Sequence, residues 1–258
     1  TEITLEANPG TFESEKFRGF LNAGVNRLSI GVQSFNDRFL KSLGRIHSST
    51  EADRAIKIAY DVGFENINID LMYGLPEQTV AEAISDLEQA FQHSPQHLSW
   101  YQLTLEPNTV FYSKPPVLPV SEKLEAIQDQ GLLALSENGF SRYEVSAFAK
   151  PNQRSVHNEN YWLFGDYLGI GAGAHGKITL GKDDKILRSR KIRQPDAYLK
   201  SSLSFSAERI EVSKEERSLE FLMNALRLVD GFPIPLFEQR TGLPFDTIVK
   251  QLESLQEN

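Results

Sequence analysis

Three polar side chains that can bind a ligand or exchange a proton occupy equivalent places in three predicted strands. Glu6, Gln33 and Asp70 each stand at the C-terminal end of a strand-like segment. In barrel folds that rim is where ligands bind and catalysis takes place. Since a buried carboxylate is costly unless it is paired or hydrogen-bonded, three such groups converging on one rim indicate a ligand site. The alternative for each residue is an exposed strand end that caps the next helix.

A cationic residue follows the second of these strands after a short loop. Arg45 lies in the run Leu43-Gly44-Arg45-Ile46-His47. Its rigid guanidinium fork can hold a carboxylate. From spacing alone, a surface arginine is the simpler interpretation.

A second cluster of polar and aromatic groups occurs later, in the run His157-Asn158-x-x-Tyr161-Trp162. Histidine can ligate haem iron, and aromatic rings suit a flat macrocycle. A packed loop with an ordinary hydrogen-bonded histidine is the alternative. The glycine-rich run that follows, Gly165 to Lys177, lets backbone approach a ligand or another strand closely. It is not a phosphate-binding loop, because Lys177 is followed by Ile178.

The elements that must position these residues alternate between helix and strand through the first 150 positions. Such alternation predicts a parallel sheet with right-handed crossovers. Glycines that follow apolar helical patterns mark the helix ends, because glycine accepts a positive φ. The predicted strands are the segment that leads to Glu6, then Arg27–Phe35, Asn66–Tyr73, His97–Leu105 and Arg142–Phe148, and the predicted helices are Phe17–Ala23, Ala52–Val62, Ala81–Gln92 and Leu124–Asn138.

Polarity favours a curved sheet over an open one. Ile67, Ile69 and Leu71 share one face of their strand, and Asn68 and Asp70 share the other. The apolar faces suit covering helices, and the polar faces would converge on a common interior. In the strand His97–Leu105, apolar and polar residues do not alternate cleanly, so we do not assign its residues to the two faces. With five strands countable, we predict an α/β fold built on a partial barrel whose first strands are missing.

The second half of the chain changes character. Residues 183–207 are charged and irregular, whereas residues 214–258 have helical patterns broken by proline and glycine. We therefore predict two parts: residues 1–180 as the partial barrel and its extension, and residues 181–258 as a linker and a small, mainly helical C-terminal domain.

Composition excludes several classes of function. The net charge of −8 argues against broad binding to nucleic acid or to membrane surfaces. No apolar run approaches the ~18 residues of a membrane span. The absence of cysteine excludes disulfides, thiolate zinc sites and iron–sulfur ligation by these residues, and it is in keeping with a cytoplasmic protein. Because the chain opens inside a strand-like segment, we expect it to be a fragment that lacks an N-terminal part.

Four runs of the sequence resemble, in their order and spacing, motifs of the radical S-adenosylmethionine (SAM) proteins of the oxygen-independent coproporphyrinogen III oxidase family. The His157 motif and the glycine-rich run resemble the haem chaperone branch of that family. The four runs are Leu5-Glu6-Ala7-Asn8-Pro9-Gly10, Arg27-Leu28-Ser29-Ile30-Gly31-Val32-Gln33-Ser34-Phe35, Leu43-Gly44-Arg45-Ile46-His47 and Asn68-Ile69-Asp70-Leu71-Met72-Tyr73-Gly74-Leu75-Pro76.

The resemblance implies a partial (β/α)6 barrel with a C-terminal domain, a [4Fe–4S] cluster and SAM. The three cysteines that hold the cluster in this family would lie upstream of Thr1, so this fragment alone is expected to be inactive. The residues that the resemblance assigns to SAM are Glu6, Gln33, Arg45, Asp70 and Thr104. Those that it assigns to haem are His157, as a candidate iron ligand, with Asn158, Tyr161 and Trp162.

The function that the resemblance implies is a haem chaperone. Such a protein binds haem and delivers it to an acceptor haemoprotein, with a SAM-bound cluster in the whole protein. One alternative is the oxidase itself, which converts two propionates of a porphyrinogen to vinyl groups. The other is a non-catalytic scaffold with degenerate sites, against which the intact Glu6, Gln33 and Asp70 argue.

Overall fold

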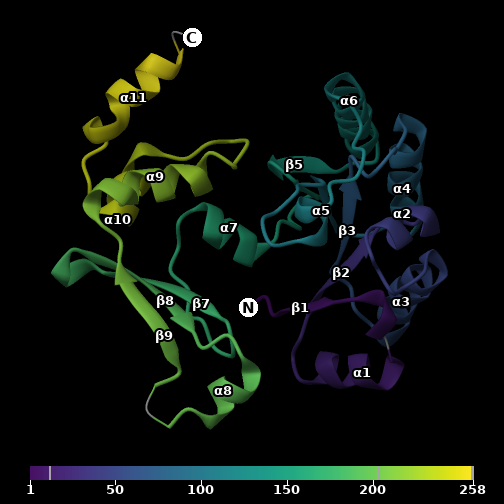
Figure 1. Ribbon diagram of the computed structural model, residues 1–258, viewed down its shortest axis with the longest axis horizontal. Helices are drawn as coiled ribbons and strands as arrows, with labels where there is room; N and C mark the ends of the chain where they lie inside the picture. The colour runs from purple at the N-terminus through teal and green to yellow at the C-terminus, as the bar shows by residue number, and fades with distance from the viewer. Residues whose placement is uncertain (12, 203, 257–258) are drawn as a thin grey trace. The chain divides into compact units, whose positions relative to one another are not determined.

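The computed structural model describes residues 1–11, 13–202 and 204–256 (Figure 1). The chain divides into two compact units, Thr1–Ser155 and Val156–Asn258. The boundary expected from the sequence, between residues 180 and 181, differs from this division. It falls between two strands that pair as a hairpin, with Leu180 opposite Lys185.

The first unit is built on a sheet in the order β1-β2-β3-β4-β6-β5. The first four strands are parallel, which confirms the predicted α/β fold. β6 runs antiparallel to β4, and β5 runs antiparallel to β6, so β5 points in the same direction as the first four strands. The strands are β1 (Thr4–Ala7), β2 (Arg27–Gln33), β3 (Ile67–Tyr73), β4 (His97–Gln102), β5 (Ser141–Glu144) and β6 (Ala147–Ala149).

One predicted strand is wrong. The segment Arg142–Phe148 is a hairpin of β5 and β6 and not a single strand. Side chains close its turn: Glu144 Oε1 accepts from the backbone N–H of Ser146 at 3.0 Å, and Arg142 Nη2 donates to the carbonyl of Val145 at 2.8 Å. Because the turn uses no glycine or proline, local composition does not mark it.

Helices follow the parallel strands, and their ends have clear local causes. Capping boxes start α3 at Ser48 and α4 at Thr79, each closed by a glutamate three residues on. Gly63 ends α3 at φ 111°, which a residue with a side chain adopts only at a cost. The helices of this unit are η1 (Pro9–Thr11), α1 (Ser14–Asn22), α2 (Asp37–Ser42), α3 (Ser49–Val62), α4 (Val80–Gln92), α5 (Val110–Ser113) and α6 (Ser121–Glu137).

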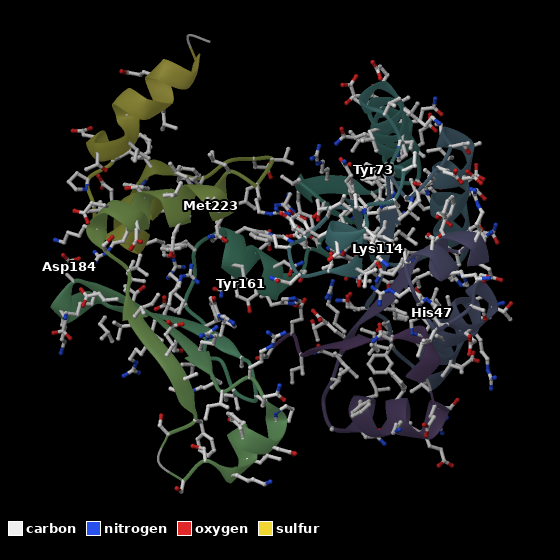
Figure 2. The ribbon with its side chains drawn as sticks, viewed as in Figure 1. His47, Tyr73, Lys114, Tyr161, Asp184 and Met223 are labelled. Atoms are coloured by element: carbon white, nitrogen blue, oxygen red, sulfur yellow. The ribbon has the colours of Figure 1, made fainter. Side chains whose placement is uncertain are left out.

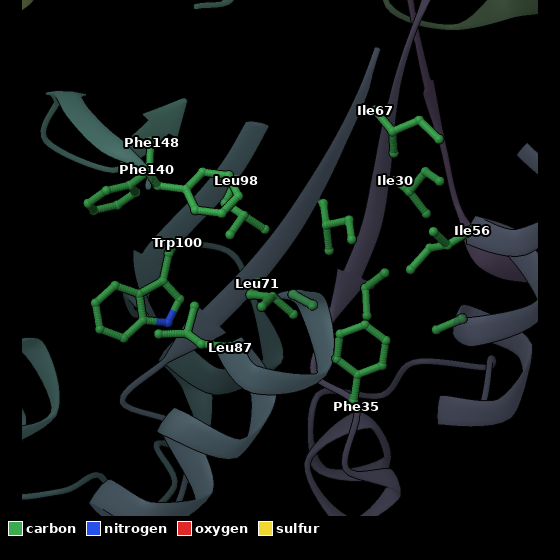
Figure 3. Packing of buried hydrophobic residues seen from close by; sticks show 14 of the residues in the cluster. Ile30, Phe35, Ile56, Ile67, Leu71, Leu87, Leu98, Trp100, Phe140 and Phe148 are labelled. Atoms are coloured by element: carbon green, nitrogen blue, oxygen red, sulfur yellow. The ribbon is translucent and has the colours of Figure 1, made fainter. Parts of the chain in front are cut away.

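The core of the first unit lies between one face of the sheet and these helices. Ile30 and Leu71 from the strands, Ile56 from α3 and Leu87 from α4 are fully buried in it (Figure 3). Since strand side chains alternate between faces, this packing leaves the polar set on the opposite face, as the sequence predicts.

The second unit combines a small sheet with helices. Its three strands pair antiparallel in the order β7-β8-β9. The region predicted to be irregular, residues 183–207, therefore contains all of β8 and the start of β9, while the helical C-terminal part is confirmed. The elements are α7 (Val156–Trp162), β7 (His175–Leu180), η2 (Gly181–Asp183), β8 (Lys185–Lys191), α8 (Pro195–Lys200), β9 (Ser206–Glu211), α9 (Lys214–Ala225), α10 (Ile234–Thr241) and α11 (Asp246–Gln256).

A buried arginine ties the sheet of the second unit to its helices. Arg217 of α9 is 2% exposed and donates to the carbonyl of Thr241 at 3.0 Å and to Asp184 Oδ1 at 2.8 Å. Asp184 is labelled in Figure 2. The adjacent core is aromatic, with Phe221 and Phe237 in edge contact at 5.2 Å between ring centroids. In neither unit does a helix of the described residues combine the length and apolar character that crossing a membrane requires.

Candidate functional site

Polar residues form a continuous row across the inner face of the first unit's sheet. Glu6 of β1 pairs with Ser29 of β2, Ser29 with Asn68 of β3, and Asn68 with His97 of β4. In parallel strands, paired residues point their side chains to the same face. Asn68 and His97 are buried and Glu6 is exposed, so the row runs from the protected interior to the open edge strand.

Asp70 lies one step above this row and receives hydrogen bonds from its neutral members. Asn68 Nδ2 donates to Asp70 Oδ1 at 2.7 Å, and Ser29 Oγ donates to Asp70 Oδ2 at 3.2 Å. Burial raises the pKa of Asp70; these hydrogen bonds lower it in part, and the charge of Glu6 raises it further. Asp70 is therefore a fixed acceptor that a donor or a positive charge on a ligand would stabilise.

His97 helps to orient the hydrogen bonding of Asp70 through Asn68, a role that sequence reasoning missed. Its Nδ1 lies 2.6 Å from Asn68 Oδ1, and its Nε2 lies 2.8 Å from the hydroxyl of Tyr143. These contacts orient the Asn68 amide so that its Nδ2 donates to Asp70. His97 thus acts through Asn68, and only the strand register could have placed it on this face.

Gln33 ends β2 in a conformation that is rare for a residue with a Cβ. Its φ is 70°, and the β2–β3 register shifts just before it. The side chain is 5% exposed, and its Oε1 accepts a hydrogen bond from the Tyr101 hydroxyl at 2.7 Å. The neighbouring Gly31 keeps the space beside this amide open: a Cβ there would stand 3.0 Å from Gln33 Nε2.

Arg45 and Thr104 line a cavity of about 530 Å³. That volume lies within the range of small-molecule sites, ~300–1,000 Å³. The loop that carries Arg45 is anchored by the buried His47 (Figure 2), whose Nε2 lies 3.0 Å from the carbonyl oxygen of Val32. The Thr104 hydroxyl donates to Glu106 Oε1 at 2.8 Å.

Tyr101 connects the predicted residues electrostatically. Burial raises the pKa of its phenol to about 12, the charge of Asp70 adds to the rise, and Arg45 and the hydrogen bond to Gln33 oppose it. Tyr101 therefore contacts Gln33, the charges of Arg45 and Asp70 act on its phenol, and the charge of Glu6 acts on Asp70. The sequence predicts Glu6, Gln33 and Asp70 at strand ends; Asp70 instead lies in the middle of β3, and the sequence did not identify Tyr101.

The second predicted cluster lies on α7. His157 and Tyr161 are four residues apart and share a helix face, with their rings in edge contact at 6.4 Å between centroids. Tyr161, which is exposed (Figure 2), is in edge contact with Tyr167 at 4.7 Å. Asn158 and Trp162 have the same spacing on the adjacent face, and the guanidinium of Arg227 lies 4.3 Å from the Trp162 ring centroid.

The glycine-rich run forms a close backbone approach. A Cβ on Gly169 would stand 2.1 Å from the carbonyl oxygen of His175, so only glycine fits there. The run is fixed by the buried Lys177, whose Nζ donates to Asp166 Oδ1 at 2.9 Å and to the Phe164 carbonyl at 3.0 Å. The close approach predicted from the glycines is therefore between two backbone segments of the second unit.

No group of three or more histidine, aspartate or glutamate side chains in the described parts of the chain could hold a metal ion. An iron–sulfur cluster would take its cysteine ligands from outside this sequence, which has no cysteine.

Comparison with known proteins defines the class first. Residues 1–90 match the Radical SAM superfamily model, and residues 212–258 match the HemN C-terminal domain model. The solved structure of coproporphyrinogen III oxidase (HemN) from Escherichia coli, a radical SAM enzyme, has the same fold. Its TM-score is 0.78 at 22% identity, over 98% of this chain and 61% of that one. The fold is that of a radical SAM protein.

Two curated relatives narrow the class. Heme chaperone HemW of Escherichia coli (strain K12) is 50% identical over 98% of this chain and 66% of its own length. Heme chaperone HemW of Haemophilus influenzae is 48% identical over all of this chain and 67% of its own length. The chain belongs to the HemW family and spans about two thirds of the length of these relatives.

Proposed function

We propose that this chain is the part of a haem chaperone that carries the haem site and one wall of a SAM site. The protein would bind haem and deliver it to an acceptor haemoprotein in the cytoplasm. The observation that carries the proposal is the constellation on α7, where His157 and Tyr161 share one face and Asn158 and Trp162 the next. Close kinship with proteins named heme chaperone supports it.

The haem side follows from the chemistry of these four residues. His157 supplies an imidazole that can ligate iron. Tyr161 is exposed and stands between the rings of His157 and Tyr167, so it offers aromatic surface to a macrocycle. Trp162, beneath the Arg227 guanidinium, and Asn158 would shape the adjacent side.

The SAM side follows from the donors and acceptors on the inner face. SAM carries a carboxylate, an amine and ribose hydroxyls. Arg45 suits the carboxylate because its guanidinium can bind it in bidentate fashion. Glu6 and Asp70 suit hydroxyl or amine donors, Gln33 offers an amide, and backbone at Thr104 borders the cavity where the adenine would lie.

These residues fit the cofactor, because Gly31 leaves space next to the Gln33 amide and the cavity beside Arg45 is of small-molecule size. SAM bound at a [4Fe–4S] cluster supplies radical chemistry that belongs to the cofactor. This chain would contribute binding and orientation. Arg45 would pair with the carboxylate of SAM, and Asp70 and Glu6 would accept hydrogen bonds from its hydroxyl or amine groups.

The test is a hemin titration followed by the shift of the Soret band. His157→Ala is expected to weaken hemin binding at least about tenfold, the loss expected of an iron ligand worth more than ~1.4 kcal/mol. The matched control is His175→Ala, which removes an exposed histidine of β7 in the same unit. Equal affinity for wild type and His157→Ala would remove His157 from the haem site. Absence of any hemin binding by the wild type would refute the chaperone function.

A further inference from the structure

The backbone of Gln33 is held in a conformation that it would not adopt unaided. A φ of 70° is costly for a residue with a Cβ and persists only where surrounding contacts impose it. Such conformations cluster at functional sites. Two contacts from distant parts of the first unit impose this one.

The first contact fixes the turn after Gln33. Asp86 of α4 is 3% exposed, and its Oδ1 accepts from the backbone N–H of Phe35 at 2.7 Å. Its Oδ2 accepts from the Ser34 hydroxyl at 2.7 Å, and Ser34 Oγ in turn accepts from the N–H of Asn36 at 3.0 Å. One buried carboxylate therefore fixes three successive residues immediately after Gln33.

The second contact fixes the Gln33 side chain. The Tyr101 hydroxyl donates to Gln33 Oε1 at 2.7 Å. Burial and Asp70 raise the pKa of Tyr101 to about 12, so the phenol keeps the proton that it donates. With its oxygen occupied, the Gln33 amide presents Nε2, a group that can only donate.

Glycine at position 31 avoids a close contact with Gln33 Nε2. Gly31 precedes Gln33 by two residues, and a Cβ there would stand 3.0 Å from Nε2 and 3.5 Å from Asn8 Oδ1. Any larger residue would crowd the amide. The inner face thus offers an N–H donor of fixed orientation that no side chain at position 31 crowds.

We propose that Tyr101 and Asp86 are positioning residues that set Gln33 as an N–H donor to an oxygen atom, carboxylate or hydroxyl, of the bound SAM. The inference rests on the proposed function, since SAM is the ligand in question. Tyr101 acts on the side chain and Asp86 on the backbone, and neither needs to touch the ligand.

The experiment is a double-mutant cycle on SAM affinity, measured by equilibrium dialysis with radiolabelled SAM and the whole protein with its cluster bound, because this sequence holds no cysteine to ligate a cluster. Tyr101→Phe removes one hydrogen bond and is expected to weaken binding about fivefold. Asp86→Asn should weaken it by a similar factor, and Gln33→Ala by more. Added to Gln33→Ala, neither change should cost further affinity, because both act through Gln33. Tyr60→Phe and Asp53→Asn are matched controls that alter hydrogen bonds on α3 and should leave affinity unchanged.

The outcomes separate this inference from the function on which it rests. Independent, multiplying losses for Tyr101→Phe and Gln33→Ala would overturn it, and so would unchanged affinity in Tyr101→Phe. If Arg45→Ala weakens SAM binding while Gln33→Ala does not, the inference fails and the SAM site stands. If the cluster-loaded wild type does not bind SAM, the SAM part of the proposed function fails.

Discussion

Asp86 should make the stability of the first unit fall as pH rises from about 4 to about 7. The carboxyl is almost fully buried, and burial raises its pKa from 3.8 to about 6, with the charge of Glu82 adding to the rise. Hydrogen bonds from Ser34 and Phe35 oppose the shift without cancelling it. The folded chain therefore holds this proton more tightly than the unfolded chain does.

The magnitude follows from the two pKa values. A rise from 3.8 to about 6 amounts to about 3 kcal/mol of stabilisation when the carboxyl is protonated. This stabilisation is fully present below the unfolded pKa and is lost as pH rises through the folded pKa. Between about pH 4.5 and about pH 7 the loss is about 2 kcal/mol.

The assay compares wild type with Asp86→Asn, which keeps the shape of the side chain but cannot titrate. Urea unfolding is followed by tryptophan fluorescence in a Trp162→Phe background, so that Trp100 in the core of the first unit is the reporter. The unfolding free energy of wild type minus that of the variant should fall by about 2 kcal/mol over the range from about pH 4.5 to about pH 7. Other titrating groups are common to both proteins and cancel.

A difference that stays flat across this range would refute the reasoning. It would mean that the hydrogen bonds from Ser34 and Phe35 offset burial completely, so that Asp86 is ionised in the folded chain at every pH tested. A difference that rises with pH would mean that they outweigh burial. In either case Asp86 would still fix the turn, but as a carboxylate throughout.

Two further predictions concern packing and a buried charge. Gly131→Ala should destabilise the first unit by about 2 kcal/mol, because its Cβ would stand 1.9 Å from Trp100 Cη2; Trp100 fluorescence during urea unfolding measures it, and an unchanged midpoint would contradict it. Asp166→Ala should destabilise the second unit by about 2 kcal/mol, and more than Lys177→Met does, because it leaves the buried ammonium without its carboxylate; unfolding followed by Trp162 fluorescence decides the order.

Alternation along single strands was enough to predict the inner polar face. Ser29, Asn68 and Asp70 occupy the positions that a period of two assigns to them, opposite a buried apolar set. The pattern is reliable here because the outer face is fully covered by helices, so that a polar residue on that face would be penalised.

The strand that carries Tyr101 was harder to interpret. His97, Ser99 and Tyr101 alternate with Leu98 and Trp100, and a tyrosine suits either face. Its contact with Gln33 joins residues 68 positions apart. Only the pairing of β3 with β4 brings these residues together, and local composition does not encode that register.

The strands of the second unit escaped prediction for a different reason. Every residue of β9 is exposed, so no apolar period marks it. Its charges instead pair across the sheet, as Lys185 does with Glu211 at 2.9 Å. Exposed charged pairs of this kind contribute little to stability, and a sequence built from them resembles a surface loop.

The two candidate sites differ in electrostatic character, and this difference supports the ligands proposed for them. The hydrogen-bond partners of Asp70 are the neutral Ser29, Asn68 and Ser99, and its pKa is raised, so the inner face near it favours a positive charge over a second carboxylate. SAM brings a sulfonium and an amine, and Arg45 is available for its one carboxylate. Haem, with two propionates, suits that face poorly. α7 carries a single carboxylate, that of Glu159, and its aromatic and imidazole groups suit the macrocycle. The charges therefore favour SAM on the sheet and haem on α7.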